Sequence, residues 1–144
     1  MSDAIPRNER NSAAFGALIA GLVFLFIGFV YLAPPAGVPS LEHYTIAAVY
    51  WGTRGLGLAL LAVAGLYALG LGAAAWLGLV VEGLAAILCI GAGPTLFAYG
   101  YPTDGVVLLI LGLLSAREAL SAWRMTQRPR FAAAGTADEG GTAP

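Results

Sequence analysis

Charge is scarce in this chain. Only 10% of its 144 residues are charged, against roughly 25% in an average soluble domain. Lysine is absent and the formal net charge is -1, so the chain lacks the positive excess that a nucleic-acid-binding protein uses against phosphates. A small domain with 59% hydrophobic residues must have a largely apolar surface, which a bilayer accepts and water does not. The composition predicts an integral membrane protein and excludes an ordinary soluble enzyme.

Cysteine and histidine each occur once, as Cys89 and His43. One cysteine excludes an internal disulfide and a C-x-x-C redox pair, and a haem held between two imidazoles needs a second histidine. The sequence contains no Walker loop, no G-x-S-x-G and no H-E-x-x-H. No set of His, Cys and carboxylate residues converges as a zinc site requires. We therefore predict a non-enzymatic protein with no cofactor and no metal.

The apolar segments predict an all-α fold of four transmembrane helices in up-down order. Residues 13–33 carry no charge, and their length matches the roughly 20 residues that cross a bilayer core. Residues 44–103 are long enough for two more spans and contain only two charged residues, Arg54 and Glu82. A fourth span follows the next loop. The chain then divides into an N-terminal tail (1–12), a transmembrane domain (13–126) and a polar tail expected to be disordered (127–144).

Interfacial aromatic residues indicate where the middle segment turns. A turn at Glu82 would leave Tyr67 and Trp76 in the middle of the membrane, whereas a turn at residues 69–72 places both at an interface. The glycine- and proline-rich segment 91–103 is typical of an interfacial loop. These turns predict helices at about 13–33, 46–69, 72–90 and 104–125.

The distribution of arginine predicts the orientation. Arg7 and Arg10 precede the first span, and three arginines follow the fourth: Arg124, Arg128 and Arg130. The loops between the first and second spans and between the third and fourth contain none. Because basic residues favour the cytoplasmic side, both termini should be cytoplasmic.

Glu82 is an ionisable residue at membrane depth, where an unpaired charge is costly. It lies ten residues past Gly72 and so about 15 Å from the predicted cytoplasmic boundary. Ala74, Gly78 and Ala86 share its helix face at steps of four, which is typical of a small-residue seam along which another helix packs. Glu82 should therefore point into the bundle.

Arg54 is the predicted partner of Glu82, in contact directly or through water, because the two lie on neighbouring helices at depths that differ by about 7 Å. Such a pair either fixes the packing of the helices or forms a polar site for a ligand. The sequence alone does not decide between the packing role and the ligand site.

Two further features concern the first and fourth helices. Arg117 and Glu118 follow only 12 uncharged residues, so they should lie within the inner leaflet or at its edge, with Arg117 extending to the headgroups. Ala17 and Gly21 form a second small-residue seam, which packs within the bundle or docks another subunit.

The segment WGTRGLGLAL at the start of the second helix has Gly52, Arg54 and Gly57 in a G-x-R-x-x-G arrangement. With the acidic residue of the third helix, it resembles the DoxX-like group of small bacterial four-helix membrane proteins. The resemblance implies an accessory or assembly subunit of the bacterial plasma membrane. The expected partners are the lipid bilayer and either a larger membrane complex or further copies of the chain. The alternative is a small transporter or binder of an amphipathic ligand at Arg54 and Glu82.

Overall fold

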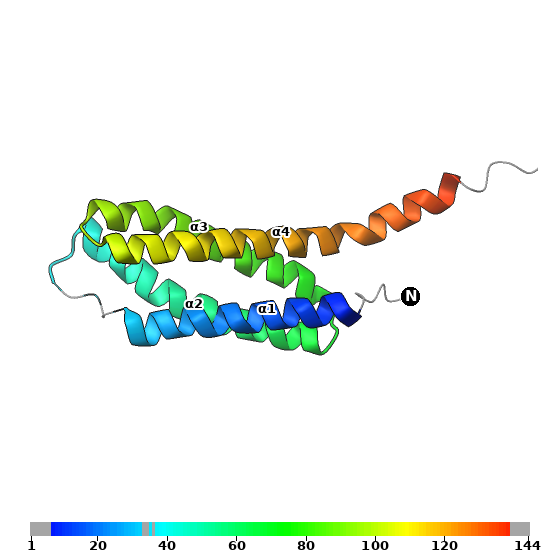
Figure 1. Ribbon diagram of the computed structural model, residues 1–144, viewed down its shortest axis with the longest axis horizontal. Coiled ribbons are helices and arrows are strands. Elements are labelled where there is room, and N and C mark those ends of the chain that lie inside the picture. Colours follow the sequence, from blue (N-terminus) through cyan, green and yellow to red (C-terminus); the bar gives the residue numbers. More distant parts are fainter. Residues whose placement is uncertain (1–6, 33–34, 36, 139–144) are drawn as a thin grey trace, which may run out of the picture.

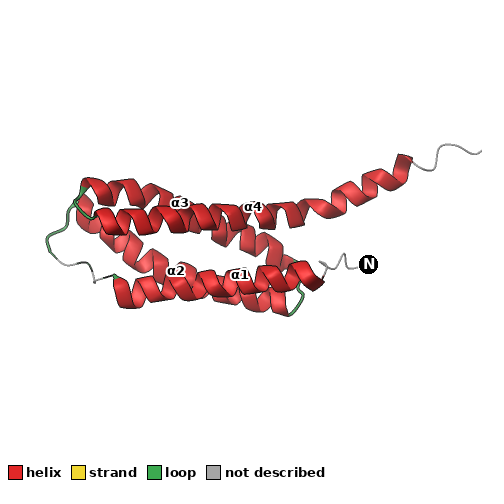
Figure 2. Cartoon of the chain, in the orientation of Figure 1, coloured by secondary structure: helices red, strands yellow, loops and turns green. Residues whose placement is uncertain are grey.

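The structure is a computed structural model that describes residues 7–32, 35 and 37–138, with side chains described as far as Gln127. Within these residues the chain is helical apart from short connections (Figure 2). The helices are α1 (Arg7–Phe26), its π-helical continuation η1 (Ile27–Tyr31), α2 (Leu41–Ala68), α3 (Ala73–Ala98) and α4 (Pro102–Asp138).

Four helical segments in this described part are long and apolar enough to cross a membrane. They are Arg7–Tyr31, Leu41–Ala68, Ala73–Ala98 and Pro102–Gln127. The predicted all-α fold with four candidate transmembrane helices is therefore confirmed. Large apolar side chains face outward on every helix, among them Phe29, Leu58, Ile87 and Leu113, as expected for a surface in contact with lipid.

Successive helices run in opposite directions, so the start of α1 and the later part of α4 lie at the same end of the bundle (Figure 1). We call this the terminal end, and the opposite one the loop end. The α2–α3 turn also lies at the terminal end. There Gly70 has a φ of +74°, which L-residues with a side chain rarely adopt, and the predicted turn at residues 69–72 is confirmed.

The bundle consists of two closely packed hairpins. In the first, a Cβ atom on Gly21 of α1 would lie 3.0 Å from the carbonyl oxygen of Gly57 on α2. In the second, a Cβ atom on Gly105 of α4 would lie 2.8 Å from the carbonyl oxygen of Gly93 on α3. Glycine lets the backbones approach this closely. α2 also packs on α3, whereas α1 and α4 barely touch.

The α3–α4 connection differs from the prediction. The segment expected to be a loop at 91–103 is helical as far as Ala98, with Pro94 inside the helix. Transmembrane helices tolerate proline because nearby groups satisfy the freed backbone. Pro94 lacks the N–H that would bond to the Ile90 carbonyl one turn earlier. Next to it, the Thr95 hydroxyl donates to the Gly91 carbonyl at 3.0 Å.

The start of the first helix and the end of the last helix also differ from the prediction. α1 begins at Arg7, six residues before the predicted start at 13, and α4 continues to Asp138 instead of ending near 125. Residues 127–138, predicted as part of a disordered tail, are thus helical. Residues 1–6 and 139–144 of the two predicted tails lie outside the described residues.

Candidate functional site

Glu82 lies on the inward face of α3. It is nine residues from the start of the helix at Ala73, or about 14 Å from the terminal end. Only 4% of the residue is exposed. The small residues that share its face, Ala74, Gly78 and Ala86, are buried as well. This face therefore carries a carboxyl group into the bundle at membrane depth.

The partners of Glu82 come from α2 and α4. The Ser115 hydroxyl on α4 donates a hydrogen bond to the Glu82 carboxyl. The second carboxyl oxygen, Oε2, is buried and accepts no hydrogen bond from the described residues. Tyr67 of α2 lies near enough to interact electrostatically with the carboxyls of Glu82 and Glu118. Its hydroxyl would be 2.9 Å from a Cβ atom on Gly78, so Gly78 makes room for the phenol.

Glu118 brings a second carboxyl to the same place. It lies about one turn after Ser115 on α4 and is half-buried. Its Oε2 atom would lie 3.5 Å from a Cβ atom on Gly16 of α1, so the side chain reaches across toward α1. Two carboxyls, from α3 and α4, thus face the space between α1 and α4.

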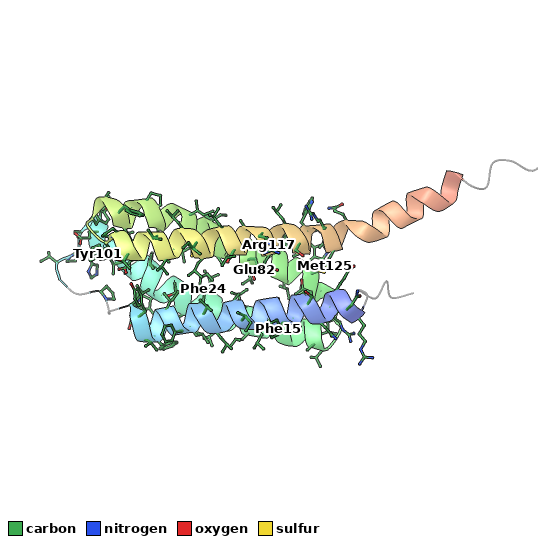
Figure 3. All side chains as sticks on the ribbon, in the orientation of Figure 1. Phe15, Phe24, Glu82, Tyr101, Arg117 and Met125 are labelled. Carbon is green, nitrogen blue, oxygen red and sulfur yellow. The ribbon has the colours of Figure 1, made fainter. Side chains whose placement is uncertain are left out.

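Three adjoining cavities occupy that space, and Glu118 lines all of them. The smallest, about 20 Å³, lies between Glu82, Tyr67 and Gly78. A cavity of about 300 Å³ extends toward the loop end and is mostly apolar, lined by residues such as Phe15, Ile19, Phe24 and Leu111. We call these cavities together the α1–α4 groove. Figure 3 shows Glu82 between α1 and α4.

The third cavity, about 320 Å³, extends toward the terminal end and has a polar lining. Glu9 and Ser12 contribute from α1, and Ser121 and Arg124 contribute from α4. The groove therefore has a polar part at the terminal end and an apolar part toward the loop end, with Glu82 and Glu118 where they meet.

Arg54 belongs to a different environment. Its Nε atom donates to the carbonyl oxygen of Gly28 at 2.9 Å. Its guanidinium lies over the rings of Tyr50, Phe29 and Trp51, with centroid distances of 3.6, 4.3 and 5.2 Å. Contacts of this kind stabilise a cation without a carboxylate.

The π-helical turn η1 supports this environment. The Leu32 N–H donates to the carbonyl oxygen of Ile27, five residues back, at 2.9 Å. Gly28 lies in this last turn, where helix carbonyls need partners from outside the helix, and Arg54 supplies one. The lack of a side chain also matters, because a Cβ atom on Gly28 would lie 2.8 Å from Cγ of Arg54.

The described structure shows no direct hydrogen bond or ion pair between Arg54 and Glu82. Arg54 donates to the Gly28 carbonyl instead, and Glu82 accepts from Ser115. Depth along a hairpin can be estimated from sequence, but the direction of a side chain around its helix also decides a contact. Arg54 faces the end of α1 and Glu82 faces the groove. The polar site is therefore formed by Glu82 and Glu118, without Arg54.

No family model, curated protein or solved structure matches this chain. The groove and its chemistry are thus the basis for a functional conclusion. In the described part of the chain, no three His, Cys, Asp or Glu side chains gather as a metal site would need.

The other residues singled out in the sequence have separate positions. Arg117 is exposed, beside the half-buried Glu118. Ala17 is buried and lines the smallest cavity, while Gly21 packs against α2. Sequence reasoning missed Ser115 and Tyr67, although a serine three residues before Glu118 in an apolar helix is a signal for a shared polar face.

Proposed function

We propose that this protein binds an amphipathic ligand within the bilayer, in the α1–α4 groove. The observation that carries the proposal is Glu82 Oε2, a buried oxygen with no hydrogen-bond donor among the described residues, beside a cavity of about 300 Å³. That volume is at the lower end of the roughly 300–1,000 Å³ typical of ligand pockets.

The division of the groove supports a ligand with two unlike parts. The apolar cavity matches a hydrocarbon tail, and the carboxyls match a polar head. A tail gains little by moving from lipid to an apolar cavity, because lipid chains are equally apolar. The affinity must then come chiefly from the head, which makes Glu82 the principal recognition group.

A photo-crosslinking experiment tests this proposal. The protein is reconstituted in phosphatidylcholine nanodiscs with dodecyl probes that carry a diazirine in the chain, and the labelled residues are mapped by mass spectrometry. We expect labels to concentrate on the groove-lining residues of α1 and α4. An even distribution over the lipid-facing sides of all four helices would overturn the proposal.

A matched pair of variants sharpens the result. Ile19→Trp places a bulky indole ring in the groove, since Ile19 lines the apolar cavity and is 45% exposed. Ile87→Trp makes the same change on α3 at a site that is 72% exposed and lines none of the three cavities. Groove labelling should fall at least about tenfold in Ile19→Trp and persist in Ile87→Trp.

A second candidate is an accessory subunit of the bacterial plasma membrane, as in the DoxX-like group, with both termini cytoplasmic. The observation in its favour is the side of the bundle where α1 and α4 barely touch, because a partner helix could close it. Purification in mild detergent with mass measurement tests this role. A larger complex that contains another protein supports it, whereas a chain that is always alone or with copies of itself contradicts it.

A further inference from the structure

The groove is unusual in the sign of its charge. Glu82 and Glu118 both line the smallest cavity and the apolar cavity, and no basic side chain lines either one in the described structure. The nearest cation in the lining is Arg124, which belongs to the cavity at the terminal end. It lies six residues past Glu118, about 9 Å further along α4. The deeper part of the groove therefore presents negative charge without a built-in counter-ion.

We propose that the groove selects amphipathic monocations, such as long-chain amines, and that each bound cation displaces a proton from the Glu82–Glu118 pair. This inference rests on the binding function proposed above. It adds the charge of the ligand head and the exchange that accompanies binding.

The physical basis is the cost of charge in a membrane. Two ionised carboxyls facing one cavity repel each other, and each charge without a partner is costly at membrane depth. A proton shared by the pair removes part of this cost, and so does a cationic head. The two therefore compete for the same carboxyls. An anionic head would add a third negative charge, and a neutral head would leave the repulsion unchanged.

The other groups that face Glu82 do not supply the missing cation. α2 contributes Tyr67, a phenol, and α4 contributes Ser115 and Glu118. The residues that α1 contributes to the smallest and apolar cavities are all uncharged. The charged residues that line the polar cavity with Glu118 are Glu9 of α1 and Arg124 of α4. A cation from outside the described residues is thus the complementary partner.

The polar cavity at the terminal end offers a route for the displaced proton. Glu9, Ser12 and Ser121 line it, and Glu118 belongs both to this cavity and to the two deeper ones. A proton that leaves Glu82 can pass to Glu118 and then to the water at the terminal end. Glu118 is therefore both part of the cation site and its connection to water.

The test uses four dodecyl competitors against the photo-crosslinking probe: dodecylamine, dodecyltrimethylammonium, dodecanol and laurate. We expect the two cations to compete at least about tenfold better than dodecanol and laurate. Glu82→Gln should abolish this preference. Glu42→Gln is the control, because Glu42 is a carboxyl at the loop end that accepts a hydrogen bond from Tyr101.

Proton release is measured separately, on the unmodified protein in weakly buffered nanodiscs. Dodecyltrimethylammonium has no proton to lose, so protons released on its binding come from the protein. We expect about one proton for each bound cation, and an apparent affinity that falls about tenfold per pH unit as acidification protonates the pair.

The outcomes separate this inference from the proposed function. If dodecanol and laurate compete as well as the cations, the groove binds ligands but the charge selectivity is wrong. If cations bind without proton release and without pH dependence, the exchange is wrong. If no probe labels the groove, the proposed function itself fails.

Discussion

Removing the charges of Arg54 and Glu82 together should change the free energy of unfolding by the sum of the two single effects. The two side chains share no partner in the described structure. Arg54 lies 14 residues before the end of α2 and Glu82 lies nine residues after the start of α3, an offset of about 7–8 Å along the hairpin. The changes in unfolding free energy caused by substitutions at separated sites without shared partners usually add to within about 0.3–0.5 kcal/mol.

An ion pair would give a different result. Breaking a buried pair by removing one charge costs about 3–5 kcal/mol, because the surviving charge is left uncompensated, and removing both recovers much of that cost. Arg54→Gln should still be destabilising by itself. It loses a hydrogen bond from a charged donor, about 1.5–3 kcal/mol, together with the aromatic contacts of its guanidinium.

Glu82 and Glu118 should behave in the opposite way and show coupling. Either Glu82→Gln or Glu118→Gln relieves the same repulsion, so the second substitution adds less than the first. Interacting neighbours typically couple by about 0.5–3 kcal/mol.

The assay is reversible unfolding in mild-detergent micelles by titration with sodium dodecyl sulfate, followed by circular dichroism. The three single variants and the two double variants complete both cycles. A coupling above about 1 kcal/mol between Arg54 and Glu82, or strict additivity between Glu82 and Glu118, would refute the assignment of partners.

Three further predictions concern packing, the aromatic site and the loop end. Gly105→Ala should destabilise the protein by about 1–3 kcal/mol in the same assay, because its Cβ atom would lie 2.5 Å from a ring carbon of Phe97. The control Gly91→Ala, at a position with open space, should be neutral or stabilising by up to about 1 kcal/mol. Equal effects of the two substitutions would contradict the close approach of α3 and α4. Arg54→Lys should lower the melting temperature although it keeps the charge, because an ammonium group cannot reproduce the planar contacts with the rings. Glu42→Gln should lower the pKa of Tyr101, since the hydrogen bond and the negative charge of Glu42 raise that pKa; ultraviolet titration of Glu42→Gln with and without Tyr101→Phe measures the change.

Much of the fold could be predicted because the decisive signals are local. The length of the apolar segments determines the number of spans, and the interfacial position of Trp76 distinguishes the turn at Gly70 from a turn at Glu82. Tyr67 also lies close to the turn, but its side chain is buried in the bundle. The end of α3 was harder to predict, because Pro94 is a helix breaker in water but is accommodated in this helix. The close packing of Gly93 on Gly105 depends on a neighbouring helix and has no local signature.

The candidate site could be predicted only in part. Small residues four positions either side of Glu82 indicate an inward face, and Glu82 is buried. The meeting of Glu82 with Ser115 and Glu118 depends on the rotation of α4 about its own axis. That rotation is set by glycine contacts between the two helices, so sequence spacing alone favoured the neighbour at similar depth, Arg54, over residues further along the chain.

The weak contact between α1 and α4 has a mechanical consequence. Three of the four helix–helix interfaces around the bundle are packed. At the fourth, between α1 and α4, the cross-section of the protein in the membrane plane can change with the least loss of contacts. Lateral tension in a bilayer does work in proportion to a change in that area. Any ligand that holds α1 and α4 further apart is therefore coupled to tension, and the coupling is reciprocal: stretched membranes favour occupancy, and occupancy favours the expanded cross-section.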